Sequence, residues 1–269
     1  MAQSKLQTEM VQHLAQQLSR MERSVCSLGE LQPSDRPAPL GTGIAPLDAI
    51  LPGGGLVPGT LVEWLSPAKG SGAEPLMFQM AAQAMQRGGN LVVVDPTGEF
   101  YPPTADCWGI ALQRTVVVHP ANERDMFWAF EQALRCPGVA VAVCTVSQLN
   151  DRVFRRLQLA AEQGGGLGLL LRAARFRDQP SWADVRLNVT PSEVKHTARL
   201  EPARLDPADP MPADQKFVDP GRRMLLELLR CRGQGSGRRL ELELNDETGA
   251  VRLVAKLATP KVVRRATGA

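Results

Sequence analysis

Apolar side chains near the start of the chain recur at alternating spacings of three and four residues. This spacing predicts a helix over residues 4–28, since residues three and four apart share one helix face. The apolar face either packs on the protein's own core or docks on a partner or neighbouring subunit, and the pattern allows both. The residues that would make a partner contact are Val11, Leu14, Leu18, Met21 and Val25. Three prolines over 32–40 then predict a linker, so residues 1–36 are expected to stand apart from the core.

Between residues 41 and 171 the pattern changes to short apolar runs that alternate with helical segments. These runs lack regular polar positions, which is typical of parallel strands buried on both faces. The predicted strands are 61–65, 91–94, 115–119, 139–144 and 167–171. The predicted helices are 74–87, a helix capped by Asn122 that ends near Arg135, and 147–163. The sequence therefore predicts an α/β fold with a mostly parallel central sheet flanked by helices.

The last third of the chain is patterned differently. Residues 182–189 predict a further strand, whereas 224–232 fit either a helix or a strand. Apolar and polar residues alternate over 239–244 and 250–257, on either side of an Asn-Asp-Glu-Thr-Gly turn, which predicts an antiparallel β-hairpin. Six prolines and many charges over 191–220 predict a flexible insertion. The core is thus expected over 37–258, followed by a basic, disordered tail over 259–269.

Composition narrows the classes of function. The five cysteines form no Cys-x-x-Cys pair and the three histidines lie far apart, so neither a disulfide framework nor a metal site is expected. The N-terminus lacks an apolar leader and no apolar run reaches the length of a membrane span, which predicts a cytoplasmic protein without a membrane partner. A net charge of +3 does not by itself indicate nucleic acid. The tryptophans are expected in or near the core: Trp64, Trp108, Trp128 and Trp182.

One segment stands where a phosphate-binding loop would lie, between a predicted strand and a predicted helix. Such a loop cradles phosphates with backbone N–H groups, and it ends in a lysine and a Ser or Thr that bind phosphate and magnesium. Here Ala73 replaces the lysine and Glu74 the hydroxyl residue. At about 4 Å two like charges repel by roughly 4 kcal/mol in a dielectric of about 20, so Glu74 opposes phosphate binding. The loop residues in question are Ser66, Pro67, Gly70, Ser71, Gly72, Ala73 and Glu74.

Three interpretations of this loop stay open: a plain strand-to-helix turn, a weakened nucleotide site and a working ATPase. The missing lysine and hydroxyl favour the plain turn, so no nucleotide cofactor and no catalytic residue are expected. The lysine at position 69 precedes the glycines and cannot simply take the place of the missing one.

The stretch 41–59 resembles the entry to a RecA core, with its Leu47-Asp48 pair, its glycine cluster at 53–55 and its Pro58-Gly59 turn before the strand. Within that superfamily the chain resembles the ImuA family. The segments that carry the resemblance are 95–103 with 108–110, 154–162, 180–187 and 228–233. The match covers roughly residues 38–258, and it leaves out the N-terminal helix and the proline-rich insertion.

The resemblance implies a RecA-like accessory role in SOS-type, damage-induced translesion DNA synthesis and mutagenesis. The implied partners are an ImuB-like relative of Y-family polymerases and an error-prone DnaE-type polymerase. RecA and DNA are additional candidate partners. It also implies where catalytic groups of an active recombinase would lie. The catalytic glutamate matches Thr97, with Glu99 two residues late, and the aspartate that organises the magnesium-bound water matches Cys144. Together with the loop, these replacements predict a pseudo-ATPase. The competing hypotheses are a weak DNA-dependent ATPase that modulates recombinase filaments and a pure protein scaffold.

Arginines near the C-terminus form the candidate DNA contact. Arginine with glycine suits contact with the phosphate backbone, although a solvated face explains the same pattern. The candidate residues are Arg222, Arg223, Arg230, Arg232, Arg238 and Arg239. Two smaller groups leave the same choice open: Arg152, Arg155 and Arg156 at helical spacing, and Arg172, Arg175 and Arg177 after a strand, where recombinases place loops that face DNA.

Overall fold

A computed structural model describes residues 38–192, 221–232, 237–245 and 249–254. The predicted helix over 4–28, with its partner-binding candidates, lies outside these residues. So do most of the linker, the insertion from 193 to 220 and the tail. The domain boundaries proposed from the sequence therefore remain predictions.

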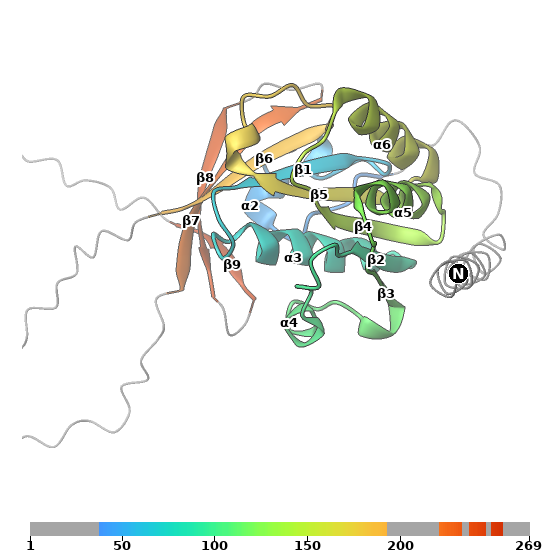
Figure 1. The fold of residues 1–269 in the computed structure, drawn as a ribbon. Helices are drawn as coiled ribbons and strands as arrows, with labels where there is room; N and C mark the ends of the chain where they lie inside the picture. Colours follow the sequence, from blue (N-terminus) through green and yellow to red (C-terminus); the bar gives the residue numbers. More distant parts are fainter. Residues whose placement is uncertain (1–37, 193–220, 233–236, 246–248, 255–269) are drawn as a thin grey trace, which may run out of the picture.

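Within the described residues, the core is one nine-stranded sheet in the order β3-β2-β4-β5-β1-β6-β7-β8-β9 (Figure 1). The strands from β3 to β6 pair in parallel, and β6, β7, β8 and β9 pair antiparallel. Their bounds are β1 Leu61–Ser66, β2 Asn90–Val94, β3 Thr115–Val118, β4 Val139–Thr145, β5 Leu167–Ala173, β6 Val185–Pro191, β7 Arg222–Cys231, β8 Arg238–Leu244 and β9 Val251–Leu253. The predicted α/β fold with a mostly parallel sheet and a C-terminal antiparallel hairpin is confirmed.

Helices cover both faces of the sheet. The helix α3 (Ala73–Met85) packs on one face with α2 (Ala45–Asp48), while α5 (Glu123–Arg135) and α6 (Asp151–Gly164) pack on the other. Alternate residues of each strand point to the two layers: Val93 joins the α3 side and Val92 the α5–α6 side. Short helices complete the fold: η1 Pro52–Gly54, α4 Pro102–Cys107, η2 Leu112–Arg114 and η3 Ala174–Phe176.

Several element bounds differ from the sequence prediction. The strand expected over 182–189 is β6, Val185–Pro191, so the first residue of the insertion predicted over 191–220 belongs to a strand. The helix α6 begins at Asp151, not at residue 147, because the side chain of Asn150 accepts a hydrogen bond from the Val153 N–H at 2.9 Å and caps the helix there. The ambiguous segment 224–232 is strand β7, since the edge of β6 offers it a row of backbone partners. Tertiary pairing, rather than local propensity, decides that segment.

The prediction for the tryptophans is wrong at two positions. Trp64 is fully buried and Trp108 is half-buried, but Trp128 and Trp182 keep 47% and 42% of their surface exposed. The size and apolar surface of a tryptophan suggest burial from the residue type alone, but only the packing of the folded chain shows which tryptophans are covered.

The cysteines Cys107, Cys136, Cys144 and Cys231 form no disulfide, and Cys107 is the exposed one among these four. Within the described residues, no group of side chains could hold a metal ion. The helices in this part of the chain are too short or too polar to cross a bilayer.

Candidate functional site

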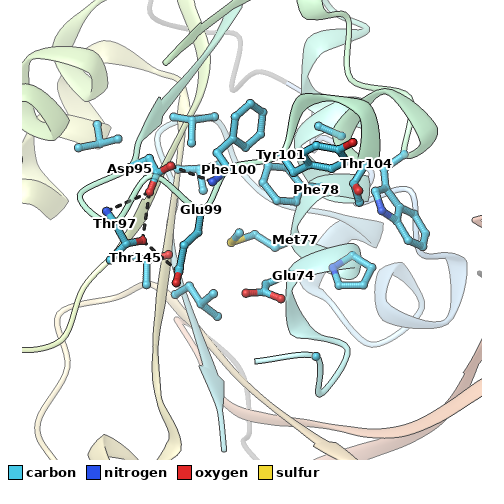
Figure 2. A pocket seen from close by; sticks show the side chains of 18 of the residues that line it. Glu74, Met77, Phe78, Asp95, Thr97, Glu99, Phe100, Tyr101, Thr104 and Thr145 are labelled. Atoms are coloured by element: carbon cyan, nitrogen blue, oxygen red, sulfur yellow. Dashed lines mark hydrogen bonds between the residues drawn. The ribbon is translucent and has the colours of Figure 1, made fainter. Parts of the chain in front are cut away.

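A cavity of about 280 Å³ lies where β2, β4 and β5 end and α3 begins (Figure 2). Parallel α/β sheets place ligands at this edge, because the loops that follow the strands open a crevice there. Its walls are mainly apolar and aromatic, and its rim carries carboxylates. The walls include Met77, Phe78, Phe100, Tyr101, Ala105 and Trp108.

The degenerate phosphate loop forms one side of this cavity. Its two serines turn inward: Ser71 Oγ donates to the Ala68 carbonyl at 2.8 Å, and Ser66 Oγ donates to the same carbonyl at 2.7 Å. The Gly70 carbonyl faces outward and accepts a hydrogen bond from Arg222 at 3.4 Å. Both loop hydroxyls are therefore hydrogen-bonded to the loop's own backbone. The Gly70 carbonyl oxygen is bonded to the guanidinium of Arg222.

Glu74 lies in the first turn of α3 and lines the cavity, as Figure 2 shows. Its carboxylate takes the place at which a phosphate loop would present its hydroxyl. Ala73, one residue earlier, is buried and carries no donor. Of the loop residues predicted from the sequence, Gly70 and Glu74 line the cavity, whereas Ser66, Pro67, Ser71, Gly72 and Ala73 are not among its lining residues.

The opposite rim is the turn after β2. Asp95 accepts hydrogen bonds from the backbone N–H groups of Thr97 at 3.1 Å, Gly98 at 2.9 Å and Phe100 at 2.8 Å. Burial raises the pKa of Asp95, but these N–H donors outweigh it and hold the pKa below its usual value of 3.8. The carboxylate of Asp95 therefore stabilises this turn by accepting hydrogen bonds from its backbone.

Thr97 and Glu99 occupy the predicted positions of the missing and the displaced carboxylate. The Thr97 hydroxyl bonds to Asp95 and to Glu99, and the exposed Glu99 pairs with Lys69 of the loop. The Lys69 partner and the Thr97 hydroxyl lower the pKa of Glu99. Lys69 therefore pairs with Glu99 on the opposite rim of the cavity, and it does not replace the lysine that the loop lacks.

Cys144 is fully buried in β4 and belongs to the core layer under α5 and α6, so it does not line the cavity at which its match to a recombinase aspartate would place it. Burial, with a contribution from the charge of Asp95, raises the pKa of the Cys144 thiol well above its usual range. The strand β4 lines the cavity with Val143 and Thr145 instead, and neither of these side chains is a carboxylate. Among the side chains that line the cavity, Glu74 is acidic, Glu99 is acidic but paired with Lys69, and Arg222 is basic. The lysine of a phosphate loop has no counterpart at position 73, which is Ala73.

The six candidate arginines do not gather on one surface. Arg222 and Arg223 lie at the end of β7 beside the phosphate loop, and Arg223 pairs with Glu243. At the opposite end, Arg230 donates to the Ser181 carbonyl, and Arg232 pairs with Glu162 at 2.9 Å and Asp184 at 3.3 Å.

The other two candidates lie on β8. Arg239 pairs with Glu227, while Arg238 donates to the Ile50 carbonyl. The six residues are therefore spread over both ends of β7 and over the neighbouring strand, and whether any of them touches DNA stays a prediction.

A buried ionic cluster escaped the sequence analysis. Glu63 of β1 is fully buried and lies 2.7 Å from Arg172 Nη1 and 2.8 Å from Arg186 Nε. Arg186 Nε is not aligned to donate a hydrogen bond, so that contact is an ion pair only. Arg172 packs on Phe176 and Phe154, with its guanidinium carbon 4.6 Å and 5.8 Å from the ring centres. Arg172 is therefore not available to DNA. The signal in the sequence was a lone glutamate within an apolar strand.

Comparison with known proteins gives consistent results. No protein-family model matches the chain. Protein ImuA of Caulobacter vibrioides is 31% identical over 130 residues, which are 46% of this chain and 53% of that protein. Protein RecA of Laribacter hongkongensis is 28% identical over 142 residues, 51% of this chain and 40% of that protein. A chloroplastic DNA repair protein recA homolog of Arabidopsis thaliana is 30% identical over 125 residues, which cover 46% of this chain and 28% of that protein.

The match to ImuA spans about half the length of that protein. Among solved structures, the RadB recombinase aligns with a TM-score of 0.55 at 17% identity, over 78% of this chain and 97% of that one. At this identity the likeness supports the fold alone, and it agrees with the sequence matches. The resemblance predicted from the sequence is confirmed: about half of this chain is similar to ImuA and to RecA proteins, and its fold is similar to that of the RadB recombinase.

Proposed function

We propose that this protein is a non-catalytic RecA-like accessory factor in damage-induced mutagenic DNA synthesis. It links an ImuB-like protein and an error-prone DnaE-type polymerase, and it neither binds nor hydrolyses ATP. The relatives named ImuA and RecA support the setting in DNA damage. The lack of catalysis rests on the cavity.

The position of Glu74 is the observation that carries the proposal. Its carboxylate faces the cavity at the N-terminus of α3, where a nucleotide-binding relative needs groups that attract phosphate and magnesium. The loop hydroxyls are used internally, and β4 lines the cavity with Val143 and Thr145, neither of which is a carboxylate. Each change alone weakens a nucleotide site, and together they act on both the phosphate and the metal.

ATP turnover by the full chain, with and without single-stranded DNA, tests the proposal. We expect no turnover above background in either case, and no protection of the fold by ATP in thermal melts. The competing function, a weak DNA-dependent ATPase, would show turnover that a Glu74→Gln variant keeps and that a change in the loop backbone, such as Gly72→Ala, abolishes. That result would contradict the proposal that the protein is non-catalytic.

The partner part of the proposal needs a separate measurement. Co-purification of the full chain with an ImuB-like protein, compared with a chain lacking residues 1–36, asks whether the predicted N-terminal helix makes the contact. We expect the complex to form with the full chain. If neither chain retains the partner, the linking role is wrong, whatever the ATP result.

DNA contact is the remaining point. Salt-dependent DNA binding that falls when Arg238 and Arg239 are replaced would favour an accessory factor that touches DNA. Binding that is absent at low salt would favour a protein scaffold without DNA affinity.

A further inference from the structure

Three of the segments that carry the resemblance to ImuA meet at one surface. Residues 154–162 lie on α6, 180–187 lead into β6, and 228–233 include the end of β7. Arg155 stacks over the ring of Trp182, with its guanidinium carbon 4.9 Å from the ring centre. Arg232 joins Glu162 to Asp184. The segment after η3 passes from the end of β5 back to β6 beside α6 (Figure 1). We call this the Trp182 surface.

The Trp182 surface combines exposed apolar area with positive charge. Trp182 is 42% exposed, and Leu159, one turn after Arg155 on α6, is 45% exposed. Four arginines here have no carboxylate at ion-pair distance among the described residues: Arg152, Arg155, Arg175 and Arg230. The carboxylates of the same region that lack an arginine partner in this part of the chain are Asp151 and Asp178, which leaves an excess of positive charge.

The buried ionic cluster makes this surface rigid. Arg186 donates to the carbonyls of Phe176 at 2.6 Å, Arg177 at 2.6 Å and Gln179 at 3.0 Å, and the Ser181 hydroxyl donates to Glu63 at 2.7 Å. Glu63 therefore ties the segment that carries Trp182 to the centre of the sheet. Aromatic anchors that are held in place before binding lose little entropy on contact.

We propose that the Trp182 surface docks an acidic segment of a partner protein, with an apolar side chain of that segment seated between Trp182 and Leu159. Charge complementarity argues for an acidic occupant, since its carboxylates could pair with the four arginines that have no ion-pair partner among the described residues. The exposed tryptophan and arginines are the residue types that dominate binding energy at protein interfaces. The inference rests on the proposed function in one respect, because an accessory factor has to meet a protein.

Single-stranded nucleic acid is a weaker fit to the same surface. A base would have to stack on Trp182, but Arg155 already covers one face of its ring. Glu162 and Asp184 flank Arg232 and would repel a phosphate backbone. Leu159 offers no aromatic ring to a second base.

A selection of random peptides displayed on phage against the full-length protein tests the inference. Enriched peptides should combine Asp or Glu with Leu or an aromatic residue. A fluorescent synthetic copy should bind the wild type, and Trp182→Ala should weaken it about tenfold or more, as expected for an interface anchor. Trp128→Ala is the matched control, since Trp128 is equally exposed but lies on α5. It should leave the affinity unchanged.

A charge reversal guards against variants that merely fold poorly. Peptides whose acidic residues are changed to lysine should bind Arg155→Glu better than they bind the wild type. Three outcomes overturn the proposal: no acidic peptides are enriched, the enriched peptides bind Trp182→Ala as well as wild type, or oligothymidylate binds in a way that needs Trp182. None of these readouts involves ATP, so they fail independently of the non-catalytic assignment.

Discussion

Some charged side chains of this protein lie in its interior, where burying a charge costs free energy, and Glu63 is the clearest case. A fully buried carboxylate is stable only with close cationic partners, and Arg172 and Arg186 supply them. Removing one member of such a group leaves the others uncompensated in the interior.

Glu63→Gln should therefore lower the free energy of unfolding by about 3–5 kcal/mol, because two buried arginines lose their counter-charge. Urea unfolding followed by circular dichroism measures this loss. Glu243→Gln is the control, since the Arg223–Glu243 pair is about one-third exposed and should contribute no more than about 1 kcal/mol. Equal losses in the two variants would contradict the role given to the buried cluster.

Asp95 supplies a pH-dependent contribution to stability. Its pKa is lowered in the folded protein, so its stabilising effect is complete above its usual pKa of 3.8 and is lost as the pH falls below that value. Wild type should exceed Asp95→Asn in urea midpoint at neutral pH, and the difference should shrink as the pH falls below 3.8. A difference that stays constant down to acid pH would show that the carboxylate charge is not what braces the turn.

At the scale of elements, the helices α5 and α6 approach each other closely through their backbones at Gly164. A Cβ at Gly164, the last residue of α6, would lie 1.9 Å from the Leu134 carbonyl oxygen of α5. No other residue type fits that gap without moving one helix.

Gly164→Ala should therefore be strongly destabilising and should lower the thermal midpoint more than Gly165→Ala does. Gly165 has φ 78°, which strains an alanine by about 1 kcal/mol, but its side-chain position is open. The pair separates a packing clash from a backbone preference. A larger shift for Gly165→Ala in differential scanning calorimetry would refute the packing argument.

The elements were predictable to different degrees, for physical reasons. The continuous apolar runs at 91–94 and 139–144 could only be buried strands, and both were found within a residue or two of the predicted ends. The strand β7 was ambiguous because Glu227 and Arg230 interrupt its pattern, and these polar residues are accommodated by Arg239, Arg177 and the Ser181 carbonyl. Such partners come from distant parts of the chain, and no local pattern reveals them.

The same limit applied to the site. The loop Ser66–Glu74 could be located because its flanking strand and helix were evident. The aromatic wall formed by Phe78, Phe100 and Trp108 could not, because it joins α3 to the segment after β2. The Trp182 surface could not be predicted for a related reason, since its residues come from separate segments that only the fold brings into contact.

At the scale of the whole molecule, the parallel and antiparallel parts form one continuous sheet. The central strand β1 pairs with β5 on one side and β6 on the other, while β3 and β9 each have one pairing partner within the part of the chain that the structure describes. One sheet with one shared core should unfold as one unit.

Hydrogen exchange should therefore be slowest in β1, β5 and β6 and fastest in the edge strands β3 and β9. In urea below the unfolding midpoint, the protection of β7 should fall together with that of β1. Mass spectrometry of peptides from each strand measures both. Loss of protection in β7 and β8 while β1 stays protected would mean that the antiparallel part is a separate folding unit.

The distribution of thiols has a practical consequence. Cys136, Cys144 and Cys231 are buried and therefore poorly accessible to reagents, and burial also raises the pKa of the Cys144 and Cys231 thiols. Cys107 is exposed at the end of α4, next to Trp108 in the cavity wall. Once Cys26, outside the described residues, is replaced by serine, an environment-sensitive dye would attach at Cys107 alone. Its emission, quenched or released by the neighbouring indole, would report directly on anything that enters the cavity.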